Sequence, residues 1–264
     1  MTLADCFTPQ ELVEDIFRQC ADLRPPIPIK RLAKAAGIID ILPLTKTDKV
    51  EGMLVSDEGK NRGVIYYRDC VPPGRQRFTI GHELGHFLLL HHHTRQQCSS
   101  SDIKANGDIS SAVDFEGEAN LFSQQLLMPE TFLSSYLPSN STPNLELIKS
   151  ISEKFEMSFE AIANRCATLS SNPFALIYSK DGVVRYAWKN KNTFLHWIPL
   201  DKGDPLPNQS QAIRLRNSDS TISSTELVSA EIWLKGTQNR PIPELLTEQT
   251  YTQEKGYQVT MILI

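Results

Sequence analysis

The stretch His82-Glu83-Leu84-Gly85-His86 decides how the fold and the chemistry of this chain are read. In a helix, residues four positions apart lie one turn apart on the same face, so the imidazoles of His82 and His86 can reach one metal ion. Glu83 flanks that ion and can take a proton from a water molecule that the ion activates. The spacing predicts the active-site helix of a zinc-dependent peptidase, against the alternative of a solvated helix with two chance histidines.

The flanking residues favour a packed helix. It follows a break at Pro72-Pro73-Gly74, and apolar residues such as Phe78, Phe87 and Leu88 give it a side that can face a core. Gly85 costs helix stability relative to alanine. Its presence is tolerable if another element approaches the helix closely at that point.

A catalytic zinc ion usually has three protein ligands. His92 lies ten residues after His82, as in enzymes of the HExxHxxGxxH type, but Leu89 stands where that pattern needs a glycine to turn the chain. We therefore expect the helix to continue past Leu89. His91, His92 and His93 would then lie at its solvated end, where histidines suit the helix dipole.

Two glutamates compete for the third position. A second helix is predicted from its apolar stripe, which consists of Phe115, Ala119, Phe122 and Leu126. Glu116 and Glu118 lie on opposite flanks of that stripe, and Glu116 shares its flank with Asn120 and Ser123. We choose Glu116 as the ligand and Asn120 as the residue that orients groups around the metal. The alternative for both glutamates is an exposed acidic face.

Separate blocks of sequence recur in a fixed order, and together they resemble the ImmA/IrrE metallopeptidases. The blocks are Arg75 to His86, Glu116 to Phe122, and Leu126 to Pro129, preceded by Pro28 to Ala33 with Gly37-Ile38. The resemblance covers about residues 8 to 170. It implies a zincin-like fold, the metal ligands His82, His86 and Glu116, and Glu83 as the catalytic base. Gly81 stands where the family often has alanine.

The resemblance also implies a substrate. ImmA/IrrE peptidases typically cleave a helix-turn-helix repressor of the Xre type and so switch on stress-response or mobile-element genes. We therefore expect an antirepressor metallo-endopeptidase in the cytoplasm, with such a repressor as its protein partner. Zn2+ is the expected cofactor, and Mn2+ or Fe2+ can occupy the same donor set. Tyr66, Tyr67 and Arg75 are candidates to stabilise the oxyanion, because they lie near the site in sequence.

Composition limits the class of protein. The formal net charge of −4 argues against broad binding to nucleic-acid phosphates. No apolar run approaches the roughly 18 residues of a membrane span, and residues 1–5 do not form a signal peptide. The five cysteines are Cys6, Cys20, Cys70, Cys98 and Cys166. They are scattered and odd in number, so we expect reduced thiols rather than disulfides or a zinc ribbon.

Three regions are expected, of overall class α+β. Residues 1–137 form a zincin-like metallopeptidase domain, residues 138–170 a helix-turn-helix-like helical segment, and residues 171–264 a β-rich α+β C-terminal domain of unknown role. Between Glu146 and Arg165 the helical segment has four acids and three bases. A unit that reads DNA should be basic, so direct DNA binding is not expected.

Two other classes of function stay open. One is a regulatory binding module that holds a repressor or toxin without hydrolysis, which the intact Glu83 argues against. The other is a DNA-binding regulator built on residues 144 to 170. Its acidic balance argues against it, and steeply salt-dependent binding to duplex DNA would support it.

Local signals predict the remaining elements of the first region. Thr8 to Glu11 form a capping box that begins a helix, and a short helix is expected at Ile29 to Ala36. Val50 to Val55 and Arg62 to Tyr67 are predicted to form a hairpin, whose second strand would be the edge on which an extended substrate pairs. Cys98 to Ser111 is expected to be a surface loop that either gates the site or only connects.

The sequence pattern of the last region, residues 171–264, is typical of short strands. The expected strands are Phe174 to Tyr178, Val183 to Trp188, Phe194 to Ile198, Ala212 to Leu215, Ala230 to Leu234 and Tyr257 to Leu263. Asp181-Gly182 predicts a tight turn between the first two, and helical periodicity is confined to Thr221 to Leu227. Trp188, Trp197 and Trp233 either line a ligand pocket or pack in the core, and we favour packing.

Overall fold

The computed structural model describes residues 7–44, 50–92, 95–99, 102–103, 114–137, 143–218, 221–237 and 239–264. The chain mixes helices and sheets, which confirms the α+β class. It divides into two compact units, one formed by Met1–Leu133 with Ser152–Ile162, the other by Ser134–Ile151 with Ala163–Ile264. The expected domain limits at residues 137 and 170 stay a prediction. Within the described ranges, no helix has the length and apolar character needed to cross a bilayer.

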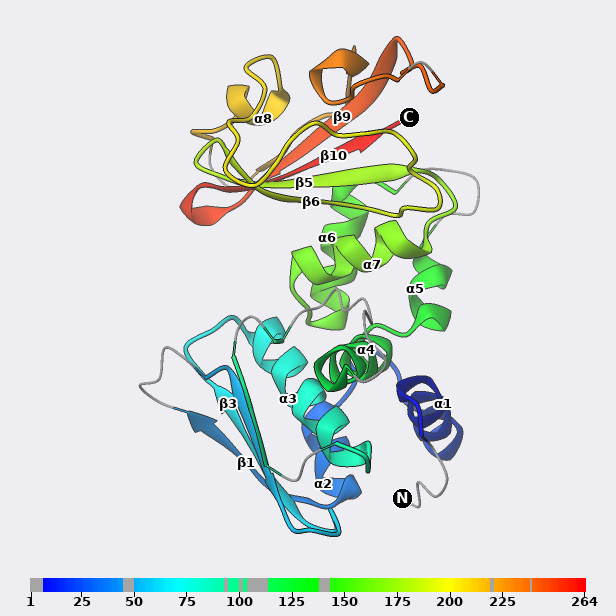
Figure 1. Ribbon diagram of the computed structural model, residues 1–264, viewed down its shortest axis with the longest axis vertical. Helices are drawn as coiled ribbons and strands as arrows, with labels where there is room; N and C mark the ends of the chain where they lie inside the picture. The colour runs from blue at the N-terminus through cyan, green and yellow to red at the C-terminus, as the bar shows by residue number, and fades with distance from the viewer. Residues whose placement is uncertain are drawn as a thin grey trace. The chain divides into compact units, whose positions relative to one another are not determined.

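The first unit joins a four-stranded sheet to several helices (Figure 1). In chain order its elements are α1 (Pro9–Gln19), α2 (Ile29–Ala36), β1 (Ile38–Leu44), β2 (Gly52–Ser56), β3 (Gly63–Arg68), α3 (Pro73–Leu88), β4 (Arg95–Cys98) and α4 (Phe115–Leu127). The predicted capping box is confirmed, since Thr8 accepts from the backbone of Glu11 and Glu11 accepts from that of Thr8. Helix α2 ends at Gly37, whose φ of 116° is left-handed, as glycine permits.

The sheet has the strand order β1-β3-β2-β4, and only the β1–β3 pair is parallel. The predicted β2–β3 hairpin is confirmed. Its second strand, however, is an interior strand with β1 and β2 on its two sides, so the expectation that β3 offers a docking edge is wrong. At the end of the strand order opposite β1 lies β4, which pairs with β2 alone among the described strands.

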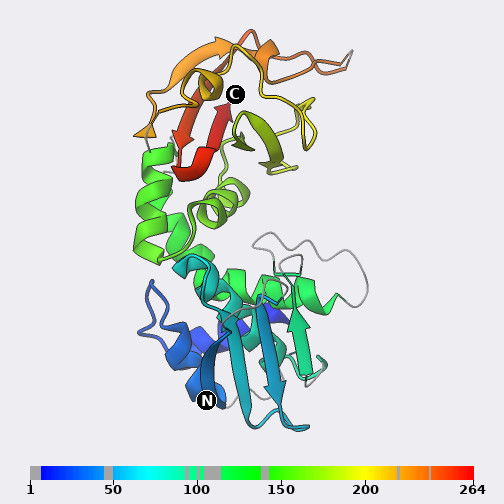
Figure 2. The same cartoon turned by 90° about the vertical axis from the view of Figure 1, so that its left-hand side faces the viewer.

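Helices α2, α3 and α4 lie on one side of this sheet (Figures 1 and 2). Two glycines of α3 let α4 approach it. A Cβ at Gly85 would lie 3.0 Å from Phe122 and 3.2 Å from the Ala119 backbone, and one at Gly81 would lie 2.5 Å from the Ser123 hydroxyl. That hydroxyl donates to the carbonyl of Phe78 in α3 at 2.9 Å. The close approach expected at Gly85 is therefore present, and Gly81 leaves room for the serine.

Helix α3 stops at Leu88, so the expectation that it continues past Leu89 is wrong. The cause lies elsewhere in the sequence. Lys60, buried at the tip of the β2–β3 hairpin, donates from Nζ to the carbonyls of His86 and Leu89, both at 2.6 Å. A lysine there satisfies backbone acceptors at the helix end and suits its dipole. Leu89 is fully buried, and the chain turns there without a glycine.

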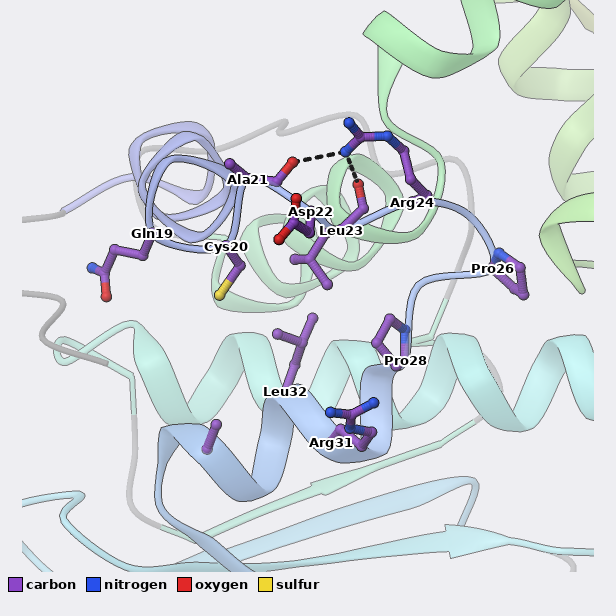
Figure 3. A pocket seen from close by; sticks show the side chains of 11 residues that line it. Gln19, Cys20, Ala21, Asp22, Leu23, Arg24, Pro26, Pro28, Arg31 and Leu32 are labelled. Atoms are coloured by element: carbon purple, nitrogen blue, oxygen red, sulfur yellow. Dashed lines mark hydrogen bonds between the residues drawn. The ribbon is translucent and has the colours of Figure 1, made fainter.

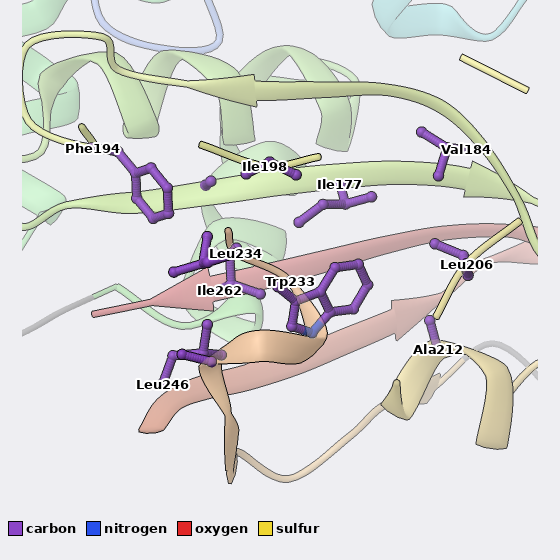
Figure 4. Packing of buried hydrophobic residues seen from close by; sticks show 12 residues of the cluster. Ile177, Val184, Phe194, Ile198, Leu206, Ala212, Trp233, Leu234, Leu246 and Ile262 are labelled. Carbon is purple, nitrogen blue, oxygen red and sulfur yellow. The ribbon is translucent and has the colours of Figure 1, made fainter. Parts of the chain in front are cut away.

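The second unit contains a sheet of order β6-β5-β10-β9-β7, with β8 also paired to β9. Its elements are β5 (Phe174–Lys180), β6 (Val183–Lys189), α8 (Gln211–Arg214), β7 (Thr221–Ile222), β8 (Glu226–Ser229), β9 (Leu245–Thr252) and β10 (Tyr257–Leu263), with a 3-10 turn at Ala230–Ile232. The β5–β6 hairpin is confirmed, and Asp181 and Gly182 both have positive φ. Trp233 is buried among Ile177, Leu234 and Ile262 (Figure 4).

Several expectations for this unit were wrong. Residues 212–215 lie in and after the short helix α8, because Ser210 accepts from the backbone of Ile213 and caps it. Residues 221–227 contain strand rather than helix, and residues 230–234 begin with the 3-10 turn. Residues 194–198 form only an isolated bridge at Trp197, and β9 was not anticipated. Trp233 packs in the core as expected, whereas Trp197 is 55% exposed.

Helix α5 spans Glu130–Tyr136, and the two helices expected after it are α6 (Leu145–Phe155) and α7 (Phe159–Leu169). Their presence is confirmed, and their kinship with a helix-turn-helix stays a prediction. Asn164 of α7 accepts from the Tyr178 hydroxyl at 2.7 Å, and Gln249 accepts from the backbone of Leu145 at 2.8 Å. Both contacts tie helical residues of the second unit to its own sheet.

Replacing Lys60 with methionine should lower the free energy of unfolding by about 2 to 3 kcal/mol, because two buried carbonyls lose a charged donor. Urea unfolding at neutral pH measures the change. Lys202→Met, at an exposed position, should stay within about 0.5 kcal/mol of wild type. Equal effects of the two substitutions would show that the hairpin lysine does not anchor the end of α3.

Candidate metal centre

Four side chains from three elements converge in the first unit. His82 and His86 come from α3, Glu116 from α4 and Cys98 from the end of β4, and their ligand atoms all lie within 4.8 Å of one another. The two histidine Nε2 atoms are 3.1 Å apart, and Glu116 lies 3.1 Å from Nε2 of His82 and 3.6 Å from Nε2 of His86. The arrangement brings together the three residues predicted as ligands.

Asn120 orients His82. Its amide nitrogen donates to the carbonyl of Asp102 at 2.7 Å, which leaves its oxygen facing Nδ1 of His82 at 3.0 Å. Since that oxygen can only accept, Nδ1 of His82 carries the proton and Nε2 is a bare lone pair. The contact agrees with the orienting role chosen for Asn120.

His86 is oriented by another histidine. Nδ1 of His86 lies 2.8 Å from Nδ1 of His92, and Nε2 of His92 lies 2.9 Å from the Glu118 carboxylate. His91 reaches the same carboxylate oxygen at 2.6 Å. The expectation of a solvated helix end is therefore wrong for His92, which is buried, whereas His91 is exposed but lies beyond the end of α3. His93 lies outside the described residues.

The carboxylate of Glu118 sets the proton positions in the hydrogen-bonded series that joins His86, His92 and Glu118. The Glu118 carboxylate accepts, so Nε2 of His92 donates and Nδ1 of His92 is bare. Nδ1 of His86 then donates to it, and Nε2 of His86 is bare. Two lone pairs and the Glu116 carboxylate thus face one another at 3.1 to 3.6 Å. Such a set is repulsive alone and fits a divalent cation, for which imidazole nitrogen and carboxylate oxygen are ordinary ligands.

Glu83 is fully buried beside these donors. Neither of its oxygens has a hydrogen-bond partner within the described part of the chain. The backbone of β2 presses against the carboxyl, because a Cβ at Gly52 would lie 2.3 Å from its Oε1. Sequence reasoning missed Gly52. Its only signal was a glycine inside the predicted strand Val50 to Val55.

The electrostatics differ among the buried groups. Burial raises the pKa of Glu83 well above its usual range. Burial also opposes the ionisation of Glu116, but the adjacent rings of His82 and His86 outweigh it and hold the pKa of that carboxyl well below its usual range. Burial lowers the pKa of His86 to about 4 and that of His92 to about 4. Both rings are therefore neutral near pH 7. Metal ligation requires this, and so do the hydrogen bonds that run from His86 through His92 to Glu118.

Cys98 was not anticipated at the site. It is buried, and its Sγ lies 3.7 Å from Nε2 of His86 and 3.9 Å from Oε1 of Glu116. No local motif marks it, since the strand pairing of β4 with β2 brings it there. The loop expected at Cys98 to Ser111 falls largely outside the described residues.

The three residues expected to stabilise the oxyanion make their contacts elsewhere. Arg75 is 3.6 Å from the Glu51 carboxylate, and the Tyr67 ring lies 5.0 Å from the Lys30 ammonium. Tyr66 pairs with Met53 in the sheet. None of these contacts reaches His82 or His86, so the donor stays a prediction.

Two hollows in the described part of the molecule lie away from this cluster. One of about 650 Å³ lies between the end of α1 and α2, where Leu23 and Leu32 point toward one another and Arg24 donates to the carbonyls of Ala21 and Leu23 (Figure 3). A smaller one of about 190 Å³ in the second unit is lined by residues that include Trp197. Neither contains a residue of the donor cluster.

The metal-free protein should lose stability as the pH falls from 6.5 to about 4. In the folded state His86 and His92 stay unprotonated down to about pH 4, whereas in the unfolded chain each takes up a proton near pH 6.5, so protonation favours unfolding across that window. Urea unfolding of chelator-treated protein at several pH values measures the slope. His92→Gln, which keeps an acceptor and a donor but does not titrate, should reduce it, and an unchanged slope would contradict the assignment.

Comparison with known proteins gives one family and a related fold. The family described as "IrrE N-terminal-like domain", among the M78 peptidases, matches residues 33–167, just over half of the chain. A solved structure of a Mycobacterium tuberculosis transcriptional regulator is similar with a TM-score of 0.51 and 14% identity, over 97% of this chain and 82% of that chain. At this identity the similarity concerns the fold alone. No curated protein matches the chain.

Proposed function

The chain belongs to the M78 peptidase family with the IrrE N-terminal-like domain, and from that premise we propose that it is a metal-dependent endopeptidase. His82, His86 and Glu116 hold the ion and Glu83 is the catalytic base. The observation that carries the proposal is a fully buried carboxyl, Glu83, beside two bare imidazole nitrogens and the Glu116 carboxylate. Zn2+ is the proposed ion, and Mn2+ or Fe2+ suits the same donors.

A bound ion of this kind supplies Lewis-acid chemistry, since it lowers the pKa of water to about 7 and polarises a carbonyl. Glu83 takes the proton of the attacking water and later delivers it to the leaving amine. Burial raises the pKa of Glu83, which makes its carboxylate a stronger base for the proton of that water. Asn120 and His92 keep the two imidazoles in the tautomers that leave Nε2 free.

The proposed substrate is an extended segment of a helix-turn-helix repressor of the Xre type, cleaved in the cytoplasm to release stress-response or mobile-element genes. Edge strand β4 supports an extended substrate, because no other described strand pairs with its outer side and its last residue, Cys98, lies in the donor cluster. The repressor itself is carried over from the family resemblance.

Glu83→Gln should keep the metal and the fold and lower cleavage by at least about 100-fold, the contribution expected of a general base. Cells that produce wild type or this variant are compared for newly formed protein N-termini. A terminus present only with wild type gives substrate and cleavage site together. Glu58→Gln, at an exposed position of the β2–β3 turn, is the matched control and should cleave like wild type. Near wild-type cleavage by Glu83→Gln would refute the role of the base.

Glu116→Ala should lose stoichiometric metal, because it removes one of three ligands. Glu118→Ala should retain metal with an affinity lowered by about 10-fold to 100-fold, since Glu118 acts through His92 and His86. Metal analysis after gel filtration and competition with a chromogenic chelator measure both. Metal retained by Glu116→Ala and lost from Glu118→Ala would move the third ligand to Glu118.

A further inference from the structure

Cys98 lies inside the donor cluster, yet the proposed hydrolysis does not use it. The residue is 1% exposed, and its Sγ is 3.7 Å from Nε2 of His86 and 3.9 Å from Oε1 of Glu116. The same residue is within 4.8 Å of all the other ligand atoms. A buried thiol that only packs needs apolar neighbours, whereas this one faces nitrogen and oxygen lone pairs.

The separations are those of ligands that share an ion. Zinc binds nitrogen at about 2.0 to 2.1 Å and sulfur at about 2.3 Å, so a nitrogen and a sulfur at tetrahedral positions lie about 3.6 Å apart. The 3.7 Å between Sγ of Cys98 and Nε2 of His86 is close to that distance. His82, His86, Glu116 and Cys98 together supply four donors, the number that a closed zinc site uses.

The thiol also stands where the attacking water has to be. A water molecule that reacts must touch both the ion and the general base. Sγ of Cys98 lies near two ligands of the ion, and Cys98 pairs in the sheet with Gly52, whose backbone lies against the carboxyl of Glu83. Glu83 is fully buried and its oxygens have no well-formed partner in the described part of the chain, so it faces this same space.

We propose that Cys98 is a fourth protein ligand that closes the metal centre and holds the peptidase in a resting state. The inference rests on the proposed three-ligand centre. When the thiol coordinates, its S–H bond breaks, an S–metal bond forms and one proton leaves to solvent, without any change of oxidation state. The site opens when the thiolate regains a proton and gives its position to water. Closed four-ligand zinc sites are typical of resting or structural centres, and catalytic sites keep one position open.

X-ray absorption of the zinc-loaded wild-type protein tests the ligand directly. We expect one sulfur at about 2.3 Å beside nitrogen and oxygen neighbours. The sulfur should vanish in Cys98→Ser and Cys98→Ala, and it should remain in the control Cys70→Ser, which changes an exposed thiol. A wild-type shell of nitrogen and oxygen alone would overturn the inference and leave the three-ligand centre standing. A wild-type protein that binds no zinc would overturn both.

Cleavage rates test the resting state. If the closed form outnumbers the open form about ten to one, removing the thiol should raise the initial rate about tenfold. Cys98→Ser and Cys98→Ala are compared with wild type and Cys70→Ser, each loaded with one zinc ion. A rate unchanged in both Cys98 variants would overturn the closing role. Should both variants fail to fold, the sulfur signal of wild type still decides whether Cys98 is a ligand.

Discussion

The close approach of helices α3 and α4 is the constraint on which the rest of the site depends. Gly81 and Gly85 remove the Cβ atoms that would hold the helices apart, and Ser123 fills the space with a hydroxyl that bonds back to α3. Only at this separation can Glu116 on one helix reach the imidazoles of the other. Sub-ångström changes matter here, because packed interiors transmit rather than absorb them.

Around this contact, hydrogen bonds fix which atom of each ligand faces inward. Asn120 sets the proton of His82 from one side, and Glu118 sets that of His86 through His92 from the other. The β2–β3 hairpin supports the same helix twice, since Gly52 lies against Glu83 and Lys60 holds the carbonyls of His86 and Leu89. The preorganisation expected of a metal peptidase is thus built largely from contacts distant in sequence.

Local chemistry made much of this fold predictable. The capping box before α1, the periodicity of α4 and the turns of the two hairpins act within a few residues, so the sequence alone predicts them. The spacing of His82, Glu83 and His86 and the shared flank of Glu116 and Asn120 likewise predicted side chains that lie together.

The errors arose where a distant residue overrides the local signal. Lys60 ends α3 from 26 residues away, which no pattern around Leu89 discloses. That turn brings His92 inward, and strand pairing brings in Cys98. In the second unit, short segments such as residues 212–215 and 230–234 are apolar enough for strands, but a serine cap and packing around Trp233 decide otherwise.

The hydrogen-bonded series of His86, His92 and Glu118 restricts where each imidazole proton can lie. Each neutral imidazole has a single proton, so the whole chain can be protonated in only one of two directions. In one direction the inner Nε2 of His86 is bare. In the other, His92 turns its lone pair outward toward His91 and Glu118, which also lie within 4.8 Å of one another, and His86 must then hold its proton on Nε2. A cation bound by the outer group therefore works against one bound by the inner group, because the two favour opposite directions of protonation.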